Sequence, residues 1–395
     1  MKLELSKENN QNYTSISILG AYVYPDQISI SLTSQYTVQQ NLYCRYYDCK
    51  RTEIPESAYR SVVFPESVLH CPRRVGAELV SVSRSLEDEE EIPEPVRLTF
   101  RSSENPPHDL TVCVAPLYGN ESKWLQIVEF VEHMKLEGAT FVYFYVGEIS
   151  DYDRKILTDY VRTGDVEVID LHDKFERPYY AWHLITIQDC HLRAKHHSKW
   201  VSFLDLDERI SGTKNQSLIE LLNAQESNVG EIQIPVLNIV KYNDMPEEFE
   251  NVVQLKEDMM FRKWTDSIDP TWNASKAIIK PEKVGIMFIH FAIAKLPGVR
   301  TIQVNESQAV VRHFRSTQHR VDLNDWQLVP QADGTLLKIT KRPLESEFAE
   351  KLTNAIVKRV LNVYDRVPVK CDRIARYLWE SRNFPNPCES MSPVF

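Results

Sequence analysis

Apolar and polar positions follow one pattern in the first quarter of the chain and another pattern after it. Between residues 13 and 105 they alternate in short runs, as at Ile28 and Ile30. Such alternation with short connections is typical of strands that bury one face, and it predicts a small β-sandwich-like unit. The sequence Asn105-Pro106-Pro107 then predicts a linker. We therefore expect an N-terminal β-rich domain with its linker over residues 1–107.

From residue 108 onward, continuous apolar runs alternate with segments that repeat apolar residues every three or four positions. The runs predict strands buried on both faces, and the segments between them predict amphipathic helices. The predicted strands cover residues 110–117, 141–146, 166–171 and 200–204, and the predicted helices begin near residue 120 and cover 151–161 and 181–194. Such alternation is typical of βαβ units. We predict an α/β fold over residues 108–395, with a Rossmann-type, mostly parallel sheet flanked by helices.

The pattern is weaker in the last part of the chain. Residues 231–240 predict one more strand, and the polar, aromatic stretch 242–271 predicts loops around a site. Residues 286–291 predict a short strand that contains His290. After Pro343, apolar residues at helical spacing predict a long amphipathic helix.

The composition argues against two classes of function. A formal net charge of -10 does not suit binding to nucleic acid, because neutralisation of phosphates by Lys and Arg dominates that affinity. The longest apolar run, residues 284–294, is much shorter than the roughly 20 residues of a membrane-spanning helix. Residues 1–10 are polar and do not resemble a secretory signal.

Glycosylation sequons and cysteines favour a lumenal protein. Asn-x-Ser/Thr sequences occur at Asn12, Asn120, Asn215, Asn273 and Asn305. We expect the Golgi or secretory-pathway lumen, with membrane association only through an anchor absent from this chain. The seven cysteines leave at least one thiol free or bonded to another chain, and Cys371 with Cys388 is the preferred pair by spacing. Because no CxxC pair is present, a zinc site is not expected.

Two aspartates directly follow the last strand of the regular region. Asp205 and Asp207 come after the buried run 200–204, and ligands of open α/β sheets bind at the carboxyl ends of strands. If this segment is extended, both carboxylates point the same way. Mg²⁺ and Mn²⁺ prefer such oxygen ligands together with substrate phosphates. The motif therefore predicts a divalent-metal site, whereas the similar triplet Asp151-Tyr152-Asp153 starts a predicted helix and is interpreted as capping.

Several short motifs resemble those of glycosyltransferase family 92. They are Asn120-Glu121 with Trp124, Tyr180-Ala181-Trp182, Asp189-Cys190, Lys199-Trp200-Val201, Asp205-Leu206-Asp207-Glu208-Arg209, Ser275-Lys276, His290, and His313-Phe314-Arg315, where the family usually has His-Tyr-Arg. The resemblance covers about residues 110–320. It implies a GT-A-like fold, a nucleotide-sugar donor and Mn²⁺, with Mg²⁺ as the alternative ion. It also implies inverting transfer of galactose from UDP-galactose to a glycan or glycoprotein, such as the core fucose of N-glycans.

The resemblance suggests roles for individual residues at the metal. Asp205 would face the ribose of the donor or the metal, and Asp207 would ligate the metal. A late histidine would be a further ligand. His313 is preferred to His290, because the neighbouring Arg315 suits a bidentate contact with phosphate.

Three other residues are candidates for donor binding, and two of them also fit a purely structural role. Lys276 would contact the diphosphate, although it equally fits a surface lysine. Asn120 and Glu121 would help to hold the nucleoside, although Asn120 also fits a helix cap.

Inversion requires a carboxylate that takes the proton of the attacking hydroxyl. Asp258, in the polar segment before the donor-side motifs, is the candidate for this catalytic base, and a solvated loop acid is the alternative. Two other functions remain open from the sequence. One is a non-catalytic carbohydrate-binding protein derived from a transferase, and the other is a hydrolase of nucleotide sugars or phosphates.

Overall fold

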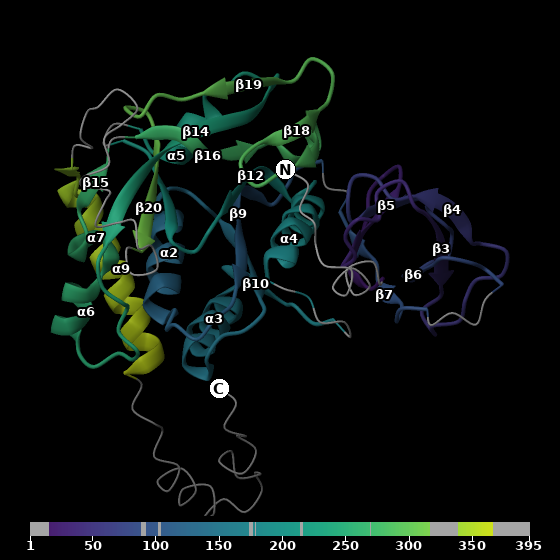
Figure 1. Cartoon of the computed structure of the whole chain (residues 1–395), viewed down its shortest axis with the longest axis horizontal. Coiled ribbons are helices and arrows are strands. Elements are labelled where there is room, and N and C mark those ends of the chain that lie inside the picture. Colours follow the sequence, from purple (N-terminus) through teal and green to yellow (C-terminus); the bar gives the residue numbers. More distant parts are fainter. Residues whose placement is uncertain are drawn as a thin grey trace, which may run out of the picture.

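The computed structural model describes residues 16–87, 92–101, 104–173, 177, 179–213, 216–268, 270–316 and 339–365. A small β-rich part lies beside a larger α/β part (Figure 1). Among the described residues, no helix combines the length and apolarity that crossing a bilayer requires. The predicted pair Cys371 and Cys388 lies outside the described residues.

The β-rich part consists of two four-stranded sheets that share one core. One sheet has the order β5-β2-β1-β8 and the other β4-β3-β6-β7. Their strands are β1 (Ile18–Val23), β2 (Ile28–Leu32), β3 (Asn41–Tyr47), β4 (Tyr59–Val62), β5 (Val68–Cys71), β6 (Leu79–Ser83), β7 (Val96–Arg97) and β8 (Thr99–Phe100). The disulfide Cys44–Cys71 joins β3 to β5 and so links the two sheets. The predicted sandwich-like arrangement is confirmed.

The α/β part begins with four parallel strands in the order β11-β10-β9-β12. These strands are β9 (His108–Leu117), β10 (Phe141–Val146), β11 (Val166–Asp170) and β12 (Ser198–Leu204). On β9, Val112 and Val114 pack with α2 (Trp124–Leu136) and α3 (Asp151–Thr163), whereas Cys113 faces α4 (Tyr179–Ala194). Because successive strand residues point to opposite faces, a continuous apolar run is what a sheet covered by helices on both faces needs.

Beyond β12 the sheet continues with antiparallel and parallel strands around β14 (Val229–Lys241). The added strands are β13 (Glu208–Ser211), β15 (Asp266–Ile268), β16 (Thr271–Ile279), β19 (Arg300–Gln303), β20 (Val310–Ser316) and β21 (Ile339–Lys341). The short helix α5 (Leu218–Asn223) has a capping box between Ser217 and Glu220. The long predicted helix is α9 (Ser346–Tyr364), which packs on α2 and α3. The predicted α/β fold is confirmed.

Two predictions for the last part of the chain were wrong. Stretch 242–271 is not only loop, because it contains α6 (Val252–Asp258) and α7 (Met260–Lys263). The Asn251 side chain accepts the N–H groups of Val253 and Gln254 and so caps α6. Residues 286–291 are not one strand. Residues 286 and 287 end β17 (Val284–Met287), and residues 288–291 form the turn to β18 (Ala292–Lys295), in which His290 lies.

Candidate active site

A cleft of about 960 Å³ opens where β9 and β12 end. Its lining comes from the segments that follow these strands, from residues 241–248 and from β20. The sequence candidates that line it together are Asn120, Glu121, Asp205, Asp207 and His313. The carboxyl edge of the parallel strands is therefore where these predicted residues meet, as the strand order requires.

The Asp-Leu-Asp segment is a turn, so the condition of an extended segment, under which both carboxylates would point the same way, is not met. The Glu208 N–H donates to the Asp205 carbonyl over 3.0 Å, and the Asp205 N–H donates to the Glu208 carboxylate over 2.8 Å. The fully buried Arg209 lies beneath this turn and donates to the carbonyls of Leu206 and Glu208. These bonds close the chain on itself, so the two aspartates do not follow the alternation of a strand. We call residues 205–208 the Asp-Leu-Asp turn.

Pairing of β13 with β20 brings His313 to this turn. Glu208 is the register partner of His313, and the His313 Nε2 lies 3.4 Å from the Asp207 Oδ2. Burial lowers the pKa of His313, but the Asp207 carboxylate outweighs it and leaves the pKa above its ordinary value. The carboxylate of Asp207 is 39% exposed, so it remains open to the cleft.

Asp205 is held by a buried lysine on the other side of the turn. The Lys276 Nζ lies 3.0 Å from the Asp205 Oδ2 and 2.8 Å from the Glu208 Oε2, and its side chain is only 3% exposed. Burial raises the pKa of Asp205, but Lys276 and His183 lower it more, so the net shift is downward. The same Lys276 opposes the effect of burial on Glu208, whose pKa is still raised to about 7. The reading of Lys276 as a surface lysine was therefore wrong.

The residues present fit a divalent cation that a substrate helps to bind. Asp207 and His313 offer a carboxylate oxygen and an imidazole nitrogen to the cleft, and Asp205 adds a second carboxylate beside them. Among the described residues, no three His, Cys, Asp or Glu side chains are close enough to enclose an ion by themselves. Mg²⁺-type sites commonly use one or two carboxylates and complete their shell with substrate phosphates. The donor set agrees with that kind of site and not with a closed structural one.

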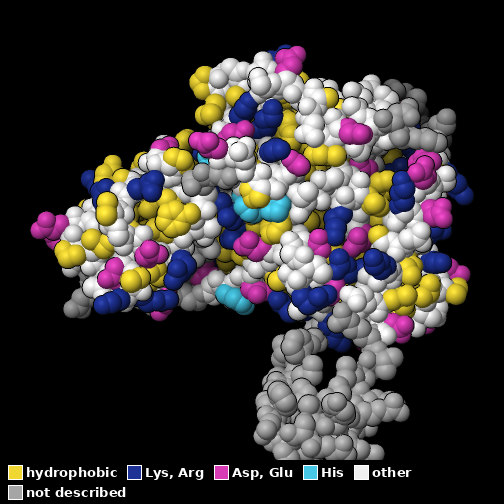
Figure 2. Space-filling model, turned by 180° about the vertical axis from the view of Figure 1, so that it is seen from behind, with side chains coloured by type: hydrophobic (Ala, Val, Ile, Leu, Met, Phe, Trp, Pro, Cys, Tyr) yellow, Lys and Arg dark blue, Asp and Glu magenta, His cyan; other side chains and the backbone are white. Residues whose placement is uncertain are grey.

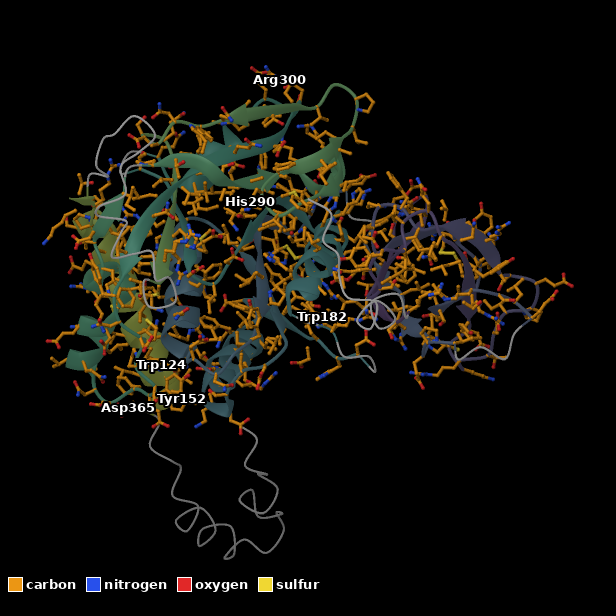
Figure 3. The ribbon with its side chains drawn as sticks, viewed as in Figure 1. Trp124, Tyr152, Trp182, His290, Arg300 and Asp365 are labelled. Carbon is orange, nitrogen blue, oxygen red and sulfur yellow. A yellow bond between two sulfur atoms is a disulfide. The ribbon has the colours of Figure 1, made fainter. Side chains whose placement is uncertain are left out.

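The segment after β9 is shaped by an aspartate from α3. The Asp153 carboxylate accepts the N–H groups of Lys123 and Trp124 over 2.9 and 2.7 Å, and so caps α2. Ser150 caps α3 itself through the Asp153 N–H. The interpretation of the second Asp-x-Asp triplet as capping is thus supported, whereas Asn120 does not cap α2. Figure 3 shows Trp124 and Tyr152 next to each other, and their ring centroids lie 6.1 Å apart.

Four predicted residues lie outside the set that lines the cleft, and one of them is the buried Lys276 already described. Asp258, at the end of α6, forms an ion pair with Lys263 over 2.8 Å. His290 is beside Ser275, whose carbonyl lies 3.1 Å from its Nδ1. Arg315 follows His313 on β20, close enough to lower the pKa of that histidine.

Some residues of this site were not predicted from the sequence. His183 on α4 lines the cleft, and its Nε2 lies 3.8 Å from the Asp205 Oδ1. Burial lowers the pKa of His183, which keeps the imidazole neutral near pH 7. Lys241 also lines the cleft, and its Nζ lies 5.5 Å from the centre of the Trp264 ring. No local signal marked either residue, because helix α4 and strand β14 reach the turn only through the fold.

The sequence pattern of glycosyltransferase family 92 matches residues 108–352, which is more than half of the chain. The chain belongs to glycosyltransferase family 92. The match begins at β9 and ends in α9, so it includes every element that lines the cleft. A family 92 glycosyltransferase fold therefore holds the Asp-Leu-Asp turn and His313.

Named relatives share part of this region. The chain is 24% identical over 240 residues to a β-1,4-galactosyltransferase of Caenorhabditis elegans, covering 58% of this chain and 53% of the relative. It is 27% identical over 156 residues to a galactan β-1,4-galactosyltransferase of Arabidopsis thaliana, covering 38% and 31%. The chain thus spans about half of the first relative's length and about a third of the second's.

Solved structures give a weaker likeness. A mannosyltransferase of Pyrobaculum calidifontis in complex with GDP-Man and Mn²⁺ has 11% identity and a TM-score of 0.31, and the match covers 73% of this chain and 84% of that one. The Staphylococcus aureus protein TarS, residues 1–349, has 11% identity and a TM-score of 0.29, covering 65% and 72%.

Proposed function

We propose that this family 92 protein is a metal-dependent, inverting galactosyltransferase. It would move galactose from UDP-galactose to a glycan hydroxyl, such as core fucose of an N-glycan. The observation that carries the proposal is the convergence of Asp207 and His313, 3.4 Å apart, beside Asp205 at the end of a buried parallel strand. The β-galactosyltransferase names of both relatives support galactose as the transferred sugar.

Asp207 and His313 would hold Mn²⁺ or Mg²⁺, with Asp205 beside them. When bound, such an ion acts as a Lewis acid that stabilises the charge of the departing diphosphate. The buried Lys276 forms ion pairs with Asp205 and Glu208 and so compensates the charges of both carboxylates. Asn120 and Glu121, which line the same cleft, would contact the nucleoside. Arg315, next to His313, would add a contact to phosphate.

Asp258 stays our proposal for the base. Asp258 is connected to the cleft through three contacts. It pairs with Lys263, whose Nζ lies 5.5 Å from the centre of the Trp264 ring, and the Nζ of the cleft residue Lys241 lies 5.5 Å from the same ring. We expect Asp258→Asn to lower kcat by about 10² to 10⁴ while donor binding is unchanged, as for loss of a general base. Lys263→Met, which frees Asp258, is the matched variant and should retain transfer. Full activity of Asp258→Asn would place the base elsewhere.

The secretory-pathway lumen remains the proposed location, and the sequons at Asn12, Asn215 and Asn305 support it. The first test is a thermal shift with UDP-galactose, with and without Mn²⁺. A donor that binds only with metal raises the melting temperature only when both are present. The second test is transfer to a fucosylated N-glycan, with NMR assignment of the new linkage; a β-galactoside supports inversion. No metal-dependent shift with any of UDP-galactose, UDP-glucose and UDP-N-acetylglucosamine would contradict the proposal.

A further inference from the structure

A bulge in β16 lies beside the Asp-Leu-Asp turn. β14 pairs Ile234 with Lys276 and Val236 with Thr271, so the four residues 272–275 stand opposite Pro235 alone. Pro235 has no N–H to donate, which suits an interruption of the ladder. Within the bulge, Ala274 has a φ of +60°, a conformation that residues with a side chain rarely adopt. Bulges of this kind are frequent next to active sites, where they redirect side chains.

The turn between β17 and β18 packs against this bulge. The Nδ1 of His290 donates to the carbonyl of Ser275, the last residue of the bulge. The Phe288 N–H donates to the Phe291 carbonyl over 2.9 Å and closes the turn. Ile289 of the same turn lines a small cavity together with His183 and Lys276. Both of these residues lie beside the Asp205 carboxylate, His183 at 3.8 Å and Lys276 at 3.0 Å. The turn 288–291 and the bulge 272–275 are therefore in contact, and we call them together the rim. Through Ile289 the rim reaches the cavity that contains His183, and His183 also lines the cleft.

This rim exposes aromatic rings that a buried core would normally cover. Trp272 and Phe291 are each 44% exposed, and Ile293, in the adjoining strand β18, is 58% exposed. Large exposed apolar side chains on adjoining segments mark sites of interaction more often than isolated ones do. Polar groups border these rings, among them His290. Figure 2 shows histidine side chains beside hydrophobic ones near the middle of one face of the molecule.

We infer that the rim of residues 272–275 and 288–291 is the subsite for the acceptor sugar. A pyranose presents an apolar C–H face and a border of hydroxyl groups, and this combination matches exposed rings next to an imidazole. Stacking on Trp272 and Phe291 would hold the acceptor ring beside the donor site. A protein partner fits less well, because the turn that carries Phe291 also carries Ile289, which lines a small cavity with His183, and His183 lines the cleft. This inference rests on the proposed function and adds the acceptor side to it.

The test separates acceptor binding from donor chemistry. Trp272→Ala and Phe291→Ala should each raise the KM for a fucosylated N-glycan about tenfold, the effect of losing roughly one stacking contact. Metal-dependent hydrolysis of UDP-galactose without acceptor should be unchanged in both. Trp272→Phe and Phe291→Tyr keep a ring and should restore the KM. Phe64→Ala is the matched control, because it removes a 56% exposed ring from the N-terminal sheets.

A second measurement does not depend on turnover. Saturation-transfer NMR with methyl α-L-fucoside and methyl β-D-galactoside should show contact with the unaltered protein and none with the double variant Trp272→Ala/Phe291→Ala. Unchanged KM in the double variant overturns the inference, and so does absence of contact with both glycosides. The inference is also overturned if the same variants lose UDP-galactose hydrolysis by the factor by which their KM rises, because the two rings would then bind the donor. Failure of the proposed function is distinct, because it appears as no metal-dependent donor binding in the unaltered protein.

Discussion

Helix α4 contacts two acidic clusters that are built in opposite ways. In its second half, Asp189 is fully buried. The hydroxyls of Tyr22 and Ser31 donate to its Oδ1, the hydroxyl of Tyr145 donates to its Oδ2 over 2.6 Å, and Arg193 donates to the same oxygen. In its first half, α4 carries His183 toward the Asp-Leu-Asp turn, where the carboxylates of Asp205 and Asp207 remain more than a third exposed.

The difference separates a carboxylate that protein donors saturate from carboxylates that remain open to the cleft. Every oxygen of Asp189 is saturated by protein donors from β1, β2, β10 and α4, so this carboxylate joins the N-terminal sheets to the catalytic sheet. The disulfide Cys113–Cys190 fixes α4 to β9 at the next residue. The Asp207 carboxylate of the Asp-Leu-Asp turn instead stays 39% exposed and lines the cleft, which suits the cation and diphosphate that we propose it binds.

The largest expected effect is the loss of Asp189. Asp189→Ala leaves the buried guanidinium of Arg193 without this partner, and breaking a buried pair costs about 3–5 kcal/mol of unfolding free energy. Urea unfolding followed by tryptophan fluorescence measures it. The control is Asp170→Ala, which removes an exposed pair with Arg154 and should cost less than about 1 kcal/mol. Equal stability of the two variants would contradict the role given to Asp189.

Asp207→Asn should give the reverse result. It removes a charge that faces the cleft, so we expect metal-dependent UDP-galactose hydrolysis to fall on the order of a hundredfold or more. The urea midpoint should stay close to that of the unaltered protein, because Asp207 is partly exposed and its main-chain bond to Phe314 is kept. A large loss of stability with normal hydrolysis would show that the two clusters have been assigned the wrong way round.

The same contrast explains how much could be predicted from the sequence. The strand that ends at Asp205 is visible because its apolar run is local, and so is the helix that follows Pro343. Asp189 was noticed only as part of a motif, because its donors Tyr22 and Ser31 lie more than 150 residues away along the chain. His183 was missed for the same reason. Short elements such as α6 were missed because a helix of two turns leaves too little periodicity to recognise.

A third prediction concerns the stability of the protein at low pH, and it depends on the buried, neutral His191 on helix α4. Burial lowers the pKa of His191 to about 4, and its Nε2 lies 3.0 Å from the Pro281 carbonyl. The unfolded chain takes up this proton near pH 6.5 and the folded chain only near pH 4. Stability is therefore lost as pH falls through this window, by about 1.4 kcal/mol per pH unit at most.

The variant His191→Gln keeps a side-chain donor for Pro281 and removes the titration. Urea midpoints between pH 6.5 and 4 should fall less steeply for it than for the unaltered protein. Identical slopes would mean that His191 is already protonated in the folded state. In that case α4 would carry a charged histidine, as the Asp-Leu-Asp turn carries charged carboxylates.

The smallest expected effect comes from removing one donor of Asp189. Tyr22→Phe leaves Ser31, Tyr145 and Arg193 on that carboxylate, so the loss is one hydrogen bond to a charged acceptor, about 1.5–3 kcal/mol. Tyr24→Phe is the matched control on the same strand end, because its hydroxyl donates to the neutral carbonyl of Leu192 and should cost about 1 kcal/mol. Neither variant should change metal-dependent donor binding. If Tyr22→Phe weakened donor binding and Tyr24→Phe did not, the hold of the N-terminal sheets on α4 would extend to His183, and the two clusters would act as one unit.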